Sequence, residues 1–282
     1  MVRRWIWVFY WFSWTSLVWA QPAGFAREGD QQLPWDSFLD RCQEARVLYL
    51  GEEHTGKIDH ELQHAVVEGL ARRGRKLVVI AEMFQWPQRQ VLVDYVERRL
   101  DDEGLKTQSE WAQRWGHPWD LYLPIWQACQ RYSLPILPLR NSSESGKQLG
   151  TLGAEAWSPD EREELAAEPY EFGPGAEQLR SLFAAHGGKV SEASFQRFLK
   201  VQVLWEEFMA AQIRKGLKAD SDQVVVLVGK GHLSHGHGLP WRVQRGWDEA
   251  LEQKVVLVNP NDEEKPRASL EWLSPGNPST TD

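Results

Sequence analysis

The sequence lacks the features that mark several specialised classes of protein. It has only two cysteines in 282 residues, so it contains no zinc site built from cysteine pairs. No run of lysine and arginine is present, and the formal net charge is −8. This balance argues against nucleic acid as a partner, because a phosphate backbone requires a basic face. The remaining composition, 42% hydrophobic and 26% charged, is typical of a soluble globular domain.

The N-terminal segment predicts export. Arg3 and Arg4 precede residues 5–19, which carry no charge and are mostly apolar. Val18 and Ala20 occupy the positions that a signal peptidase reads, at the end of this segment. The pattern is that of a secretory signal peptide over residues 1–20. The alternative is a retained anchor, but the run is shorter than the roughly 20 residues of a membrane-spanning helix. We therefore expect a periplasmic or cell-envelope protein, and with no cysteine near the cleavage site we expect no lipid anchor.

The two cysteines, Cys42 and Cys129, each fall on a predicted helix just before a predicted strand. In an oxidising compartment they could form a disulfide. They could equally be two small buried apolar side chains. The sequence leaves both alternatives open.

Short apolar runs alternate with helical patterns along the chain. This alternation predicts an α/β fold with a mostly parallel central sheet and helices on both faces. Residues 21–45 form a polar lead-in and a short helix, and residues 46–260 form the α/β domain. The predicted strands cover residues 47–50, 77–81, 134–139, 224–228 and 255–258.

Two regions depart from this alternation. Residues 150–217 contain no strand candidate, and helix starts are visible at Ser158 and Ser191. We predict a helical insertion here that covers the site. Residues 261–282 are polar and rich in proline and serine, which predicts a poorly ordered tail.

Polar side chains follow the ends of four predicted strands. Ligands of open α/β sheets bind beyond the carboxyl ends of the strands, so we expect these side chains to converge. Imidazole and carboxylate together suit either a first-row metal or general acid–base catalysis. The residues at these positions are Glu53, His54, Glu82, Arg140, Asn141 and His232.

Other histidines leave alternatives open. His60 and His64 stand four residues apart on one helix, a spacing that can hold a metal. His64 lies opposite the apolar stripe of that helix, which favours a solvated face. His60 is at the helix start and could reach the predicted site. His237 lies in a histidine-containing loop after His232.

Aromatic residues are concentrated between residues 111 and 126. They could line a pocket for a planar ligand such as a porphyrin, or they could pack a helix against the sheet. These residues are Trp111, Trp115, Trp119, Tyr122 and Trp126.

Several of these motifs, taken in order, resemble the ChaN-like haem-binding uptake proteins of the Tiki superfamily. The segment VLYLGEEH at residues 47–54 resembles the opening motif of that family. The segments VQVLWEEFMA at 201–210 and VGKGH at 228–232 resemble later motifs. Further similarity lies at residues 79–83, 119–124, 134–141 and 238–240, so that the resemblance spans about residues 47–242.

The resemblance implies an α/β fold with a helical subdomain and an extracytoplasmic haem-binding protein involved in haem or iron uptake. It also implies a homodimer, with envelope uptake machinery as a possible partner. Haem iron takes His, Tyr, Met or Cys as axial ligand, and Tyr122, Tyr170 and His186 are the ligand candidates. The predicted haem pocket comprises Tyr122, Tyr170, His186, Gln202, Trp205, Met209 and His237.

The wider superfamily implies a second function. Some of its members are metal-dependent peptidases or esterase-like enzymes that use the acidic and histidine residues at the strand ends. By motif match, the catalytic or metal-binding residues here would be Glu53, His54, Glu82 and His232, with His60 as a further metal ligand. The alternative to haem binding is therefore a hydrolase with a divalent metal ion.

Overall fold

The computed structural model describes residues 21–142, 148–149, 152–163, 191–233 and 238–276. Within these residues eight strands form one open sheet in the order β2-β1-β8-β7-β3-β6-β4-β5. The central pairings are parallel, and only β1 pairs antiparallel, with β2 and β8. The predicted mostly parallel sheet is therefore confirmed. The strands are β1 (Phe25–Glu28), β2 (Gln31–Leu33), β3 (Val47–Glu52), β4 (Leu77–Gln85), β5 (Ile136–Arg140), β6 (Gln223–Gly229), β7 (Gln253–Val258) and β8 (Leu270–Leu273).

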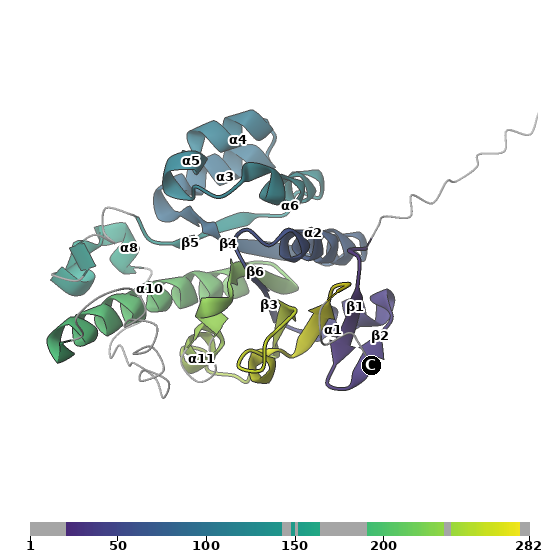
Figure 1. Ribbon diagram of the computed structural model, residues 1–282. Helices are drawn as coiled ribbons and strands as arrows, with labels where there is room; N and C mark the ends of the chain where they lie inside the picture. The colour runs from purple at the N-terminus through teal and green to yellow at the C-terminus, as the bar shows by residue number, and fades with distance from the viewer. Residues whose placement is uncertain (1–20, 143–147, 150–151, 164–190, 234–237, 277–282) are drawn as a thin grey trace, which may run out of the picture.

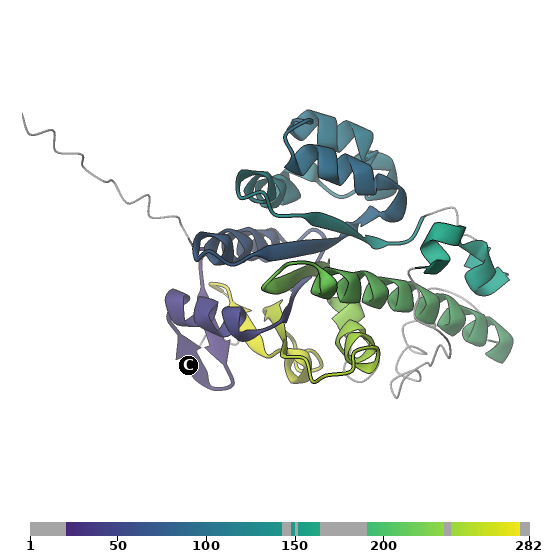
Figure 2. The same ribbon diagram turned by 180° about the vertical axis from the view of Figure 1, so that it is seen from behind.

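Helices cover both faces of this sheet (Figures 1 and 2). One face packs against α2 and α6, and the other against α10 and α11. The helices are α1 (Trp35–Glu44), α2 (Lys57–Arg72), α3 (Arg89–Val96), α4 (Asp102–Gln108), α5 (Trp111–Arg114), α6 (Trp119–Arg131), α8 (Pro159–Glu163), α10 (Glu192–Lys218) and α11 (Leu239–Arg245). Short 3₁₀ turns are η1 (Trp86–Gln88), η2 (Gly153–Ala156), η4 (Lys230–Leu233) and η5 (Lys265–Arg267).

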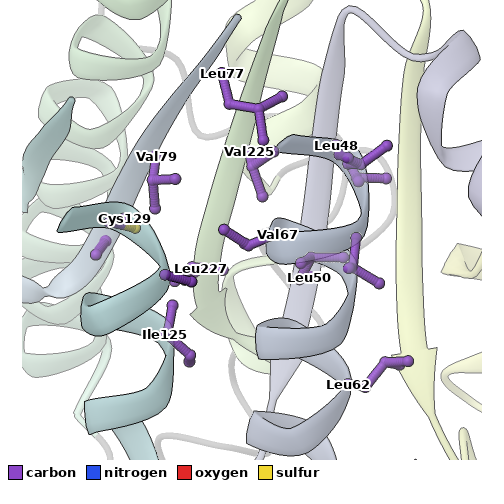
Figure 3. Packing of buried hydrophobic residues seen from close by; sticks show 14 of the residues in the cluster. Leu48, Leu50, Leu62, Val67, Leu77, Val79, Ile125, Cys129, Val225 and Leu227 are labelled. Carbon is purple, nitrogen blue, oxygen red and sulfur yellow. The ribbon is translucent and has the colours of Figure 1, made fainter. Parts of the chain in front are cut away.

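The strands are apolar on both sides because both faces are covered. In β3, Leu48 and Leu50 point toward α2 and α6, whereas Val47 and Tyr49 point toward α10. Figure 3 shows the first of these cores, where strand side chains meet Ile125 of α6 and residues of α2. Burial of each such aliphatic side chain stabilises the fold by about 1.5–3 kcal/mol. Period-two alternation therefore assigns each strand residue to one core or the other.

Helix α10 connects the sheet to the region beyond its edge (Figure 1). Ser191 caps its N-terminus and accepts the Ser194 amide, as the predicted helix start requires. Its second half packs on the sheet through Ala210, Ile213 and Leu217. Its first half runs alongside η2. The helix start predicted at Ser158 is also found, as α8.

Both ends of the described chain belong to the sheet, in contrast to the predicted lead-in and tail. The lead-in forms the β1–β2 hairpin, and β8 inserts between β1 and β7. The indole of Trp272 is buried against Trp35 and Phe38 of α1. The prediction of a poorly ordered tail from residue 261 was wrong for β8. This strand has only four residues and lies within a polar segment, so it is too short to show a pattern of alternation.

Cys42 and Cys129 are buried and not bonded to each other. They lie on α1 and α6 within the same apolar cluster. Burial raises the pKa of both thiols, since the charged thiolate is disfavoured there. The structure therefore favours the alternative of two small apolar side chains.

The predicted signal peptide, residues 1–20, lies outside the described residues. Within the described part of the chain, no helix has the length and apolar character required to cross a membrane.

Candidate functional site

The carboxyl ends of β3, β4 and β6 bring histidines and carboxylates together. Glu52 ends β3 and pairs in register with Gly229 of β6, and His54 follows two residues later. Glu82 lies in β4, on the other side of β6, and His232 lies in η4 directly after β6. Parallel strands place their carboxyl ends at one edge, so residues distant in sequence become neighbours here.

Glu52 is the central carboxylate, although it is not among the site residues predicted from the sequence. Its side chain is completely buried and accepts hydrogen bonds from His54 Nδ1 (2.9 Å), Tyr122 Oη (2.8 Å) and Gln63 Nε2 (2.8 Å). The signal in the sequence was strand alternation. Glu52 has the same parity as Leu48 and Leu50 and therefore points under α2 and α6.

Glu53, which was predicted as a site residue, lies outside this cluster. It follows the last residue of β3, and its side chain is 68% exposed. Its nearest ion-pair partner is Lys230, at 3.7 Å. The carboxylate that the site was predicted to receive from Glu53 is therefore supplied by Glu52.

His54 is held by Glu52 through Nδ1, and its side chain is 35% exposed. Its Nδ1 donates to Glu52, which raises the pKa of His54 although partial burial opposes this. The ring packs edge-on against Trp115 at 4.8 Å between centroids and lies 5.0 Å from His117. The neutral imidazole thus keeps its lone pair on Nε2, the arrangement that a general base requires.

Gly229 leaves room for the His54 ring. A Cβ atom at this position would lie 2.8 Å from His54 Cε1 and 3.4 Å from Glu82 Oε2. By contrast, a Cβ atom at Gly231 would meet no atom within 4 Å. The two glycines therefore form a matched pair for testing whether the position of His54 matters.

Glu82 and His232 form a charged pair beside His54. His232 Nε2 lies 3.6 Å from Glu82 Oε1, and the Gly229 amide donates to Glu82 Oε2 at 2.7 Å. Burial favours the neutral acid, but His232 and this amide outweigh it and lower the pKa of Glu82 to about 2. Burial also works against the imidazolium, but Glu82 and Glu206 raise the pKa of His232 to about 10. Both groups are therefore charged at neutral pH.

This pair continues into a buried ion-pair chain on α10 and α11. His232 Nδ1 lies 3.4 Å from Glu206, and Arg242 donates to Glu206 (2.9 Å) and Glu207 (2.5 Å). Arg245 also pairs with Glu207. The strand-end site is therefore linked to α10 by ion pairs. No pattern in the sequence predicted this contact.

His60 and His64 do not form a metal clamp. His60 is buried, with Nδ1 3.2 Å from Gln63 Oε1 and Nε2 3.2 Å from the His54 carbonyl oxygen, so both ring nitrogens face acceptors. His64 pairs with Glu68, on the part of α2 away from the site. Among the described residues, no three or more His, Cys, Asp or Glu side chains are arranged to hold a metal ion. The predicted metal site therefore has no support in this part of the chain.

The aromatic residues between 111 and 126 mainly form core. Trp111, Trp119 and Trp126 are buried and pack around Tyr122 and Phe84 of β4. This outcome agrees with the packing alternative rather than the pocket alternative. Trp115 is the exception, because it borders His54 and lies under the Arg140 guanidinium, 5.2 Å from its ring centroid.

The candidate haem-pocket residues separate into four groups. Tyr122 is fully buried, and burial together with Glu52 raises its pKa, which disfavours the phenolate that would bind iron. Met209 packs in the sheet core. Gln202 and Trp205 are half-buried on α10. Tyr170, His186 and His237 lie outside the described residues.

A second aromatic cluster lies where α10 meets η1 and the end of η2. Trp86, Trp157 and Phe208 pack together, and Trp205 packs against them. The indole Nε1 atoms of Trp86, Trp157 and Trp205, and Oε1 of Gln202, are buried without a hydrogen-bond partner in the described structure. Buried polar atoms are normally paired, but Trp126 in the sheet core also has an unpaired indole nitrogen, so unpaired indole nitrogens alone do not identify a ligand site.

An open, mostly parallel sheet with a polar site at its strand ends and an added helical region defines a distinct class of α/β protein. Within this class, the chain belongs to the family described as "Haem-binding uptake, Tiki superfamily, ChaN", whose model matches residues 38–243. The family named from the sequence motifs is therefore confirmed.

Solved structures of other proteins share this fold. The chain is similar to ChaN of Campylobacter jejuni, a structure described by its cofacial haem binding, with a TM-score of 0.71 and 16% identity over 90% of this chain and 97% of that one. It is also similar to the type III effector HopBA1, with a TM-score of 0.53 and 12% identity over 90% and 97% of the two chains. No curated protein sequence matches the chain significantly.

Proposed function

We propose that this protein is an extracytoplasmic haem-binding protein that takes part in haem or iron uptake. Membership of the haem-binding uptake family carries this proposal. The predicted signal peptide supports export, and the resemblance to the family supports a homodimer that works with envelope uptake machinery.

The aromatic cluster at α10 is the region that we propose for the haem, because it gathers planar apolar side chains outside the sheet core. Its members include Trp86, Trp157, Trp205 and Phe208, and aromatic rings of this kind can stack on a porphyrin. Haem also supplies an iron atom that takes an axial side chain. None of the described residues of this cluster is of that kind, so we propose Tyr170, His186 or His237 as the ligand.

Haem titration tests this function. A saturable shift of the Soret band at a fixed ratio of haem to protein is expected. Tyr122→Phe should leave the bound spectrum unchanged, because this hydroxyl is committed to Glu52. One of Tyr170→Phe, His186→Ala and His237→Ala should alter the spectrum by removing the axial ligand. A linear, unsaturable absorbance increase would contradict haem binding.

The geometry of His54 supports a second candidate function, general-base hydrolysis. The observation that carries it is the buried Glu52 holding Nδ1 while Nε2 faces Gly229 and Glu82. In such a site His54 Nε2 would take the proton of the attacking water, and Glu52 would stabilise the resulting imidazolium. This proposal requires no metal ion.

Turnover of 4-nitrophenyl acetate tests the second candidate. His54→Gln is expected to lower the rate by roughly 100-fold or more, and His64→Gln should leave it unchanged. Gly229→Ala should also lower the rate, because its Cβ would displace the His54 ring, whereas Gly231→Ala should not. Equal rates for all four variants would exclude His54 as the base.

A further inference from the structure

Arg140 lies beside the strand-end site but takes no part in the contacts described for that site. It ends β5, the neighbour of β4, and pairs in register with Gln85. Its side chain is partly exposed and lies over the Trp115 ring, with 5.2 Å between the guanidinium carbon and the ring centroid. The His54 ring packs edge-on against the same indole, at 4.8 Å between centroids. A guanidinium and the proposed base therefore contact one indole ring.

The Arg140 guanidinium has no acidic partner among the described residues. Its Nη2 donates to the Arg114 carbonyl oxygen at 3.1 Å, and its Nε is buried without a partner in this part of the chain. Burial lowers the pKa of Arg140, and the negative charge of Glu82 opposes this effect. A partly buried cation that lacks a carboxylate partner gains stability when it binds an anion.

The carboxylates of the site are already held by donors of the chain itself. Glu52 is completely buried and accepts three hydrogen bonds from neighbouring side chains. Glu82 accepts the Gly229 amide at 2.7 Å and lies 3.6 Å from the His232 ring. Neither carboxylate forms an ion pair with Arg140, so the positive charge of Arg140 is the one left for an anionic group of a ligand.

An unpaired guanidinium does not identify a binding site without a suitable position. Arg75 is also partly exposed, donates to the Gln43 carbonyl oxygen, and has a buried Nε without a partner in the described structure. It precedes β4, at the end of the sheet opposite to the site. Arg140 instead lies at the carboxyl ends of the strands, where ligands of open α/β sheets bind, and contacts the ring that packs against His54.

We propose that Arg140 binds a carboxylate of the substrate and makes the His54 site selective for esters that carry one. This inference rests on the second candidate function, general-base hydrolysis at His54. Water attacks the ester carbonyl carbon while His54 Nε2 takes its proton. The carbon–oxygen bond to the leaving group then breaks, and the proton passes to the leaving oxygen. Arg140 stays protonated and holds the distant carboxylate by charge-assisted hydrogen bonds.

Hydrolysis of mono-4-nitrophenyl adipate and of its methyl ester tests this preference. The two compounds share the bond that releases nitrophenol, and only the first carries a carboxylate at the far end of the acyl chain. A hydrogen bond to a charged group predicts a kcat/KM for the acid about tenfold or more above that for the methyl ester. Most of the difference should lie in KM, because the carboxylate does not react.

Variants assign the preference to Arg140. Arg140→Gln should raise KM for the acid by about tenfold and so remove the preference. Arg140→Lys should restore part of it, because the charge is kept but the planar guanidinium is lost. Arg75→Gln is the matched control, since it removes an equally unpaired guanidinium at the other end of the sheet, and it should keep the preference of the wild-type protein.

The outcomes that contradict this assignment differ from those that contradict hydrolysis. Equal kcat/KM for the two esters in the wild-type protein, or a preference that survives in Arg140→Gln, would remove the carboxylate site and leave hydrolysis intact. An equal fall for both esters in Arg140→Gln would reduce Arg140 to a structural role. Absence of turnover that depends on His54, for either ester, would remove the second candidate function and this inference together.

Discussion

Replacement of Arg242 by methionine is expected to destabilise the folded protein by about 3–5 kcal/mol. The Arg242 side chain is 2% exposed and pairs with Glu206 and Glu207, which are themselves buried. Methionine removes the positive charge but preserves much of the volume. The buried carboxylates of Glu206 and Glu207 then lose a positive partner. Leaving buried charges unpaired destabilises a protein by more than the ion pair itself contributes to stability.

Arg245→Met is the control for this prediction. Arg245 also pairs with Glu207, but its side chain is 28% exposed and Glu207 keeps Arg242 as a partner. We expect a loss of about 1 kcal/mol or less. Urea denaturation with a common slope for all variants measures both values. Equal losses for the two variants would show that burial of the pair does not determine its importance.

Stability is expected to fall as the pH rises from about 6.5 toward 10, because His232 then loses its proton. Its pKa is raised to about 10 by Glu82 and Glu206 against the opposing effect of burial. A raised pKa in the folded state contributes stability that is complete below the unfolded value and is lost through the folded value. For His232 this contribution is on the order of a few kcal/mol.

Glu82 defines the acidic limit of the same pair. Its pKa is lowered to about 2 by His232 and the Gly229 amide, although burial opposes this. A lowered pKa contributes stability above the unfolded value, near 4.5, and this stability is lost as the pH falls toward 2. The contribution of the pair is therefore greatest between about pH 4.5 and 6.5.

His232→Gln and His64→Gln distinguish this pair from general effects of histidine. The difference in unfolding free energy between wild type and His232→Gln should be largest near pH 6 and should vanish toward pH 10. Burial lowers the pKa of His64, so loss of its proton should not destabilise the fold as the pH rises. Chemical denaturation across this range measures both. A difference for His232→Gln that is independent of pH would contradict the charged pair.

The sequence identified the edge of the sheet that carries the site. One predicted carboxylate, Glu53, lies outside the site. His54 and His232 follow the ends of β3 and β6, Glu82 lies within β4, and the three side chains converge. The choice of Glu53 over Glu52 ignored strand alternation, which assigns Glu52 to the covered face. Gln63 and Tyr122 could not be found from spacing, because their contact with Glu52 depends on how α2 and α6 pack.

The helical region shows the same limit. The start of α10 at Ser191 was predictable from local capping, which involves only neighbouring residues. The burial of Met209 against the sheet and the half-exposure of Trp205 depend on where α10 crosses the strands. A helical period indicates that one face of a helix is more apolar than the other. It does not indicate which neighbouring element covers each face.

The sequence by itself determined the α/β class, the polar residues at the ends of successive strands, and the family. These follow from local periodicity and from motifs that occur in a fixed order along the chain. Only the tertiary structure decided that Glu52 anchors His54, that Glu206 links His232 to Arg242, and that Trp86 and Trp157 belong to one cluster. Each of these contacts joins distant segments of the chain. Such contacts arise from the packing of helices on the sheet, which balances burial, charge and hydrogen bonding over the whole domain.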